Sequence, residues 1–278
     1  MSRPVKRWTV RGGNSAFCKD GVFHSYDSNG CPRSVLLRAH GIEAPVDDIR
    51  TQKTFNVGFM NEDLFVKHYM QGICTSLDHA IDDPITDKIN FEGHADVVTD
   101  NLVFELKSVT SRNTWEMVRK GKYKVSNLAQ LVNYMLSRKA TKGFLVYSLY
   151  AYVQGLELPD IFFEVDLDSD GNILVNGKET GFHLNDIVAD RQTKARVLEN
   201  NEVYDKRPVN PTGDKSPCHY CDFKALCDRW DKATTNKTTE RFLEKAKEIT
   251  DAIKADQDIA RQERIIKATE KFGSKVYN

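Results

Sequence analysis

Apolar and polar positions alternate along this 278-residue chain in a way that predicts both helices and strands. Apolar residues recur at the spacing of a partly buried helix in residues 31–41, 51–74 and 125–139. Two runs rich in β-branched and aromatic residues, NFEGHADVV and LVFELKSV, flank the short turn Thr99–Asn101. That pattern is typical of a β-hairpin. The order of elements favours an α/β (α+β) fold, with a mixed central sheet flanked by helices.

The second half of the chain continues this pattern. The apolar run GFLVYSLYAYV predicts a buried strand, and residues 161–177 predict a further hairpin. A mostly helical stretch is expected between this hairpin and the cysteine-rich region that begins at Cys218. A charged helix is expected over residues 239–271. The polar stretch TTNKTT precedes it and is the most plausible boundary, so we expect one domain over 1–235 and a helical extension over 236–278.

Composition narrows the class of protein. Hydrophobic residues make up 40% and charged residues 29%, which is typical of a globular chain and excludes general disorder. No run approaches the roughly 18 apolar residues of a membrane helix, and the first residues lack a signal-peptide pattern. We therefore expect an intracellular, cytoplasmic protein without membrane contact. Basic and acidic residues both number 40, so nucleic acid contacts must come from local patches.

Three charged residues of the predicted hairpin can form a reactive site. Glu105 and Lys107 lie two positions apart and share one face of their strand, while Asp96 lies on the preceding strand. Converging carboxylates suit a hard cation such as Mg²⁺ or Mn²⁺, and a neighbouring ammonium can stabilise developing charge. Glu62, on the preceding helix, could complete the ligands. A solvated hairpin is the alternative, but the apolar neighbours of Glu105 make an unpaired charge there costly.

The motifs GHAD, ELK and QLVNY together resemble those of the PD-(D/E)XK nuclease superfamily, and its RecB-like members most of all. The resemblance implies a restriction-endonuclease-like core. It further implies that Asp96 and Glu105 bind metal, that Lys107 assists the nucleophile, and that Gln130 and Tyr134 support the site from a helix.

The upstream motif departs from the RecB-like pattern. Many RecB-like nucleases have a histidine four residues after a glycine, whereas here Gly58 is followed at that spacing by Glu62. Other branches of the superfamily have a carboxylate there, so Glu62 is a candidate ligand whose role the resemblance leaves open.

The cysteines suggest a second centre, since an intracellular chain does not favour disulfides. Cys218, Cys221 and Cys227 are spaced C-x2-C-x5-C, and Cys31, which begins a predicted helix, can supply a fourth thiolate. Spacing leaves iron–sulphur and zinc open, with His219 as a further zinc ligand. The early cysteine followed by three late ones resembles the iron–sulphur nucleases, including the CRISPR-associated Cas-four family. That resemblance implies a [4Fe–4S] cluster that staples the two ends of the domain.

The expected function is a Mg²⁺- or Mn²⁺-dependent DNA exonuclease. The resemblance implies single-stranded ends as substrate, a 5′-to-3′ direction, and a role in recombination, replication or repair, with a viral origin left open. The alternatives are an endonuclease on the same core and a non-catalytic DNA-binding assembly module.

Two further segments are candidate contact surfaces. A basic stretch, expected to be a loop over residues 112–124, could hold a DNA backbone, with Trp115 and Tyr123 stacking on bases. Its alternative is a solvated loop. The helix near the C-terminus could bind a protein partner, pack on the core, or stay exposed.

Overall fold

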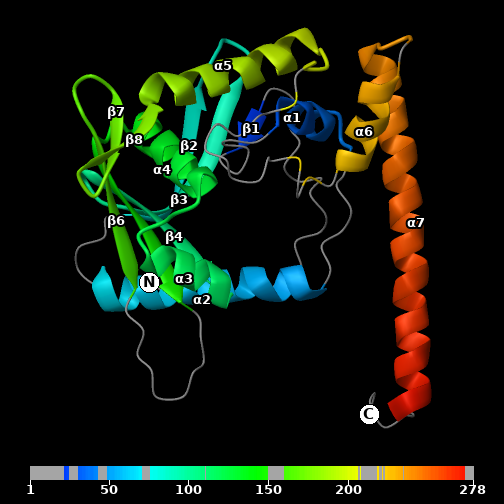
Figure 1. Ribbon diagram of the computed structural model, residues 1–278, viewed down its shortest axis with the longest axis horizontal. Helices are drawn as coiled ribbons and strands as arrows, with labels where there is room; N and C mark the ends of the chain where they lie inside the picture. The colour runs from blue at the N-terminus through cyan, green and yellow to red at the C-terminus, as the bar shows by residue number, and fades with distance from the viewer. Residues whose placement is uncertain are drawn as a thin grey trace.

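The computed structural model is a mixed β-sheet with helices on both faces and one long helix standing beside it (Figure 1). Parallel and antiparallel pairs occur in the same sheet, which confirms the mixed α/β architecture expected from the sequence. No helix in the described ranges is long and apolar enough to span a bilayer. The structure describes residues 22–24, 31–42, 49–70, 76–109, 111–149, 160–205, 207, 218, 221, 223–233 and 235–272.

Eight described strands form the sheet, in the order β1-β3-β4-β5-β6-β7-β8, with β2 on the other side of β3. Strands β1 and β3 run parallel, as do β4 and β5, and the other pairs are antiparallel. Both hairpins predicted from the sequence are present, as β3–β4 and β6–β7. The strands are β1 (Val22–His24), β2 (Ser76–Pro84), β3 (Asn90–Val98), β4 (Leu102–Val109), β5 (Lys142–Leu149), β6 (Ile161–Leu167), β7 (Asn172–Val175) and β8 (Lys178–His183).

Strands β3 and β4 separate soon after their turn. They pair only through Val97 with Phe104 and Val98 with Val103, whereas β3 pairs with β2 along its whole length. The far end of β3 pairs instead with β1. Asp96 is the first residue of β3 beyond the paired segment, so the sheet opens at the position of a candidate ligand.

Seven helices are described, and five of them match predicted segments. These five are α1 (Pro32–Ala39), α2 (Ile49–Tyr69), α4 (Val125–Arg138), α5 (Leu184–Asn200) and α7 (Thr239–Phe272), the others being α3 (Arg112–Arg119) and α6 (Lys224–Lys232). Helix α2 ends at Tyr69, before the predicted end at Cys74, which lies outside the described residues.

The predicted basic loop was wrong in its first half, because residues 112–119 form α3. The Ser111 hydroxyl caps this helix by accepting a hydrogen bond from the Thr114 amide at 3.2 Å. Trp115 and Val118 lie on one face of the helix and are buried, so the basic side chains occupy the remaining faces.

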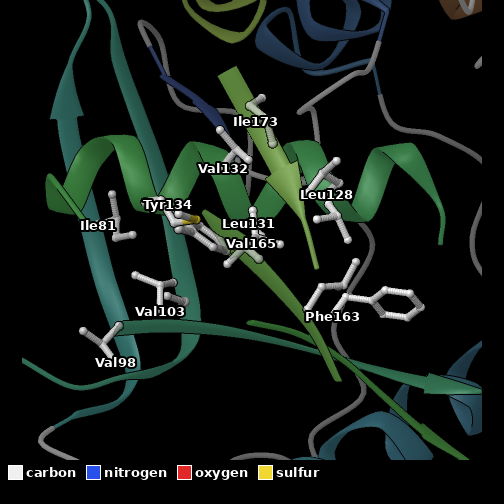
Figure 2. Close-up of a cluster of buried hydrophobic side chains, with 14 of the residues drawn as sticks. Ile81, Val98, Val103, Leu128, Leu131, Val132, Tyr134, Phe163, Val165 and Ile173 are labelled. Carbon is white, nitrogen blue, oxygen red and sulfur yellow. The ribbon is translucent and has the colours of Figure 1, made fainter. Parts of the chain in front are cut away.

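Helix α4 packs on one face of the sheet and forms the main core. Figure 2 shows Leu128, Leu131 and Val132 of α4 beside Phe163 and Val165 of β6. Helix α2 packs on the other face, where Phe65 joins Phe104 and Val146 in a smaller cluster. Val103 and Val109 lie in the α4-side core, whereas Phe104 and Leu106 lie in the α2-side cluster. The alternation of β4 therefore turns Glu105 toward α4.

A third apolar cluster lies outside the sheet. Leu37 of α1, Trp230 of α6 and Phe242 of α7 are buried together, with the Trp230 and Phe242 rings 5.2 Å apart. The first turns of α7 thus share a core with α1 and α6. Further along, α7 extends past α6 and away from the sheet (Figure 1).

Candidate active site

The opening between β3 and β4 is held by a side-chain bond. The Asp96 Oδ2 atom accepts a hydrogen bond from the backbone N–H of Leu106 at 2.7 Å, where a continuing ladder would have used a backbone carbonyl. This bond fixes the Asp96 carboxylate beside the strand that carries Glu105 and Lys107. The convergence expected from the hairpin therefore arises at the point where the hairpin pairing stops.

Glu105 is a buried carboxylate that is only half satisfied. Its side chain is 1% exposed, and its Oε1 atom forms an ion pair with the Lys107 ammonium. Its Oε2 atom is buried and has no hydrogen-bond partner within the described part of the chain. Buried polar atoms almost always have partners, and the exceptions often mark sites that bind an ion or take part in catalysis.

The electrostatics of Glu105 follow from this position. Burial raises the pKa of Glu105 to about 8, and the neighbouring Asp96 carboxylate adds to the rise. Lys107 opposes both effects, and Glu62 contributes a smaller increase. Burial lowers the pKa of Lys107, but Glu105 and Asp96 raise it more, so the ammonium stays charged. The nearby carboxylates thus disfavour the charged form of Glu105, whereas Lys107 favours it.

Helix α4 contributes two residues to a series of hydrogen bonds at this centre. The Lys107 Nζ atom donates to Gln130 Oε1 at 3.0 Å, and Gln130 Nε2 donates to the Tyr134 hydroxyl at 3.2 Å. Gln130 and Tyr134 lie one helical turn apart and share a face. The structure joins these two residues and Lys107 in one series of hydrogen bonds, at the positions that the motif resemblance implies.

Tyr147 is a neighbour of the site that the sequence analysis missed. It lies beside Lys107 in the parallel β4–β5 register, and its hydroxyl accepts hydrogen bonds from the Lys124 amide and Asn127 Nδ2, both at 3.0 Å. Its pKa is raised chiefly by burial. Only knowledge of the β4–β5 pairing could have placed it there, because no local motif marks it.

Glu62 approaches the centre from α2. The neighbouring Asn61 is buried and donates to the Ser108 hydroxyl at 2.8 Å, which ties α2 to the end of β4. Glu62 is partly buried and its charge acts on Glu105. Even so, no three histidine, cysteine, aspartate or glutamate side chains in the described ranges are grouped so as to hold a metal ion. Mg²⁺ commonly uses only one or two carboxylates with water and phosphate oxygens, so Asp96 and Glu105 fit that chemistry.

A buried arginine anchors α4 behind the site. Arg191 of α5 donates to Asn133 Oδ1 at 2.5 Å and to Asp83 Oδ2 at 2.7 Å, and its guanidinium lies 4.2 Å from the centre of the Phe91 ring. Phe91 in turn lies 6.5 Å from the ring of Tyr134. These contacts hold α4 against α5, β2 and β3. They thereby fix the position of the helix that carries Gln130 and Tyr134.

The basic stretch before α4 is exposed, but its aromatic residues are not arranged as expected. Trp115 is 7% exposed and packs in the main core, so its proposed stacking on bases was wrong. Tyr123 is half-buried and lies edge-on to Phe163 at 5.5 Å. The exposed basic residues of the stretch are Arg112, Arg119, Lys120, Lys122 and Lys124.

The cysteine region gathers thiols around Arg33. Burial raises the pKa of Cys31 and of Cys227, and Arg33 opposes the rise at Cys227 by a hydrogen bond and its charge. Charges on Cys227 and Cys218 also act on Cys31, which places these three thiols near one another. Cys221 packs against the cluster that contains Cys227.

The four thiols are not joined in disulfides in the described structure. They are also not grouped at metal-binding distance there. His219, the further ligand considered for zinc, lies outside the described residues.

Fold and site together define an α/β protein with a buried carboxylate–lysine centre. No protein-family model and no curated protein matches the chain. Among solved structures it is similar to SSO0001, with 17% identity, a TM-score of 0.45, and coverage of 75% of this chain and 87% of that one.

Two solved exonucleases show a comparable likeness. An alkaline exonuclease from Laribacter hongkongensis is 12% identical with a TM-score of 0.45, covering 66% of this chain and 88% of that one. A phage-related exonuclease from Haemophilus somnus 129PT is 12% identical with a TM-score of 0.41, covering 61% and 78%. Likenesses at this level establish neither a shared family nor a shared activity.

Proposed function

We propose that this protein is a divalent-metal-dependent deoxyribonuclease. The observation that carries the proposal is the Glu105 carboxylate, which is buried beside Asp96 and Lys107 and has one oxygen without a partner among the described residues. A carboxylate in that position is costly unless a cation completes its surroundings. Asp96 and Glu105 would hold Mg²⁺ or Mn²⁺, with Glu62 as an additional ligand.

Each residue has a distinct part in the proposed hydrolysis of a phosphodiester. The bound cation supplies Lewis acidity toward a phosphate oxygen. Lys107, held by Gln130, donates hydrogen bonds that orient the attacking water and balance the charge developing on the phosphate. Tyr134 fixes the amide of Gln130, so that its oxygen faces the ammonium.

DNA would reach this centre along the basic stretch. The exposed cations from Arg112 to Lys124 lie between β4, which carries Glu105, and α4, which carries Gln130. Such residues contact phosphates without reading sequence. We further propose exonucleolytic action on single-stranded ends in the 5′-to-3′ direction, in recombination, replication or repair, on the strength of the motif resemblance.

The proposal is tested by cleavage of DNA with purified variants. Linear single strands labelled at either end are incubated with Mg²⁺ or Mn²⁺, beside a closed single-stranded circle. We expect Asp96→Asn and Lys107→Ala to lower the rate by at least about a hundredfold. Lys142→Ala is the matched control, because Lys142 lies on neighbouring β5 and pairs at the surface with Glu164.

The outcomes separate the candidate functions. Loss of label from one end, with the circle intact, supports an exonuclease and gives its direction. Cleavage of the circle indicates an endonuclease on the same core. Tight DNA binding without metal-dependent cleavage would make the chain a non-catalytic binding module and refute the proposed chemistry.

We also propose that Cys31, Cys218, Cys221 and Cys227 hold a [4Fe–4S] cluster. The support is the four-thiol set, three of whose members interact electrostatically, with Arg33 available to balance thiolate charge. When bound, such a cluster would link the start of α1 to α6 and to the segment that precedes α6. An absorbance band at about 400 nm, together with stoichiometric iron in anaerobically purified protein, would support the iron–sulphur cluster. Colourless protein containing zinc would favour the zinc alternative.

A further inference from the structure

The C-terminal half of α7 carries an apolar stripe unrelated to the core of the protein. Ile259 and Ile266 are 58% and 56% exposed and lie seven residues apart, two turns along the helix. Figure 1 shows this half of α7 extending beyond α6, clear of the sheet and its helices. The positions that continue the three-and-four spacing, which we call the isoleucine stripe, are Ala252, Ala255, Ile259, Gln262, Ile266 and Thr269.

This stripe is a second face of α7. The residues that pack against α1 and α6, including Phe242, Ala246 and Thr250, are buried at the N-terminal end. At about 100° per residue, Ile259 and Ile266 are rotated from that face by roughly 150°. The stripe therefore does not continue the packed face into solvent. A helix that turns isoleucines away from its own core presents them to something else.

Acidic side chains border the isoleucine stripe on both sides. Asp251 and Asp258 border it on one side, and Asp256 and Glu263 border it on the other. Arg261 and Arg264 lie on the opposite side of the helix, and Lys267 lies farther from the stripe than Glu263 does. All these side chains are exposed. Four carboxylates thus border the apolar surface, and Ile265, which is 49% exposed, continues the side of Asp251 and Asp258.

Acidic borders decide which partner fits. A second copy of α7 would set Asp258 against Glu263 in a parallel pair, and Asp256 against Glu263 in an antiparallel one, so both pairings oppose like charges. Nucleic acid is disfavoured because its phosphates would meet the same carboxylates. A helix with an apolar face bordered by Lys or Arg would cover the isoleucines and pair its cations with the carboxylates.

We propose that the isoleucine stripe docks an amphipathic, basic-bordered helix of another protein. The surface lies apart from Asp96, Glu105 and Lys107, so this inference is independent of the proposed nuclease function. It assigns to α7 a role in assembly, with the DNA-directed chemistry carried by the sheet and α4.

The test uses the full chain and two synthetic three-heptad helices. Both peptides have leucine at the core positions, and one has lysine and the other glutamate along the borders. Fluorescence anisotropy should show binding of the lysine-bordered peptide at least tenfold tighter than of the glutamate-bordered one, with the difference reduced at high salt. Equal binding of the two, or none by either, would overturn the proposal.

Surface variants locate the binding. Ile259→Asp should weaken binding of the lysine-bordered peptide at least tenfold. The double variant Asp256→Lys with Glu263→Lys makes one border basic and leaves the other acidic, so it should abolish the preference between the two peptides. Arg264→Ala, on the opposite side of α7, is the matched control and should bind as the parent does. Sedimentation of the chain alone completes the test, since a dimer that Ile259→Asp dissolves would show that a second copy occupies the stripe.

Discussion

Replacing Glu105 by glutamine should stabilise the protein when no divalent metal is present. The substitution keeps the shape of the side chain and removes the buried charge. Because the pKa of Glu105 is about 8 in the fold and 4.5 ordinarily, the folded state binds the proton more tightly than the unfolded state. Stability therefore falls as pH rises between these two values, and the loss is complete above the higher one.

The size of the effect follows from the same shift. A rise from 4.5 to about 8 corresponds to at most about 5 kcal/mol, of which roughly 3 kcal/mol is lost between about pH 5.5 and pH 8.5. The amide that Glu105→Gln introduces keeps a polar atom at the position of Oε2, which has no partner among the described residues. We therefore expect a net gain of about 2–3 kcal/mol at pH 8.5, and a much smaller gain at pH 5.5.

Denaturant unfolding in EDTA at the two pH values measures this difference. Mg²⁺ or Mn²⁺ should then stabilise the parent at the higher pH but not Glu105→Gln, since ligand binding to the folded state adds stability. Glu164→Gln is the matched control on β6, where the carboxylate is 42% exposed and pairs with Lys142. The reasoning would be refuted if Glu105→Gln were less stable than the parent at pH 8.5. It would also be refuted if the difference in stability between the two proteins were the same at both pH values.

Three further changes test other parts of the structure. Gly143→Ala should lower stability by about 1–3 kcal/mol in denaturant unfolding, because the added Cβ would lie 2.9 Å from the Val103 carbonyl oxygen. Gln130→Ala should reduce DNA cleavage by roughly tenfold to a hundredfold through loss of its bond to Lys107, with thermal stability nearly unchanged. Arg191→Met should cost about 3–5 kcal/mol at any pH, and full stability in that variant would show that its contacts do not anchor α4.

Local patterns carried most of what the sequence could predict. The hairpin of β3 and β4 follows from two β-rich runs around a turn, and α4 follows from its apolar spacing. Residues two apart share a face of a strand, and residues four apart share a face of a helix. Glu105 and Lys107 could therefore be placed on one strand face, and Gln130 and Tyr134 on one helix face.

Features that depend on contacts between residues far apart in the sequence could not be predicted from it. Strand β2 has an acidic sequence and owes its extended form to pairing with β3 along its length. Helix α3 is short and highly charged, so only Trp115 and Val118 mark its buried face. Tyr147 reaches Lys107 through a parallel pairing that no local motif encodes. In each case tertiary contact decides what local propensity leaves open.

Two buried charges distinguish the scaffold of this protein from its reactive centre. Arg191 and Glu105 are both nearly inaccessible, at 3% and 1% exposure. Arg191 is surrounded by acceptors and an aromatic ring, so removing it can only weaken the fold. Glu105 has one oxygen paired and one without a partner in the described part of the chain, so we expect removal of its charge to stabilise the metal-free fold. A residue that costs stability unless a cation is bound is explained by what it binds, and this is why Glu105, rather than the resemblance of the motifs around it, is the strongest reason to regard the site as a metal-dependent one.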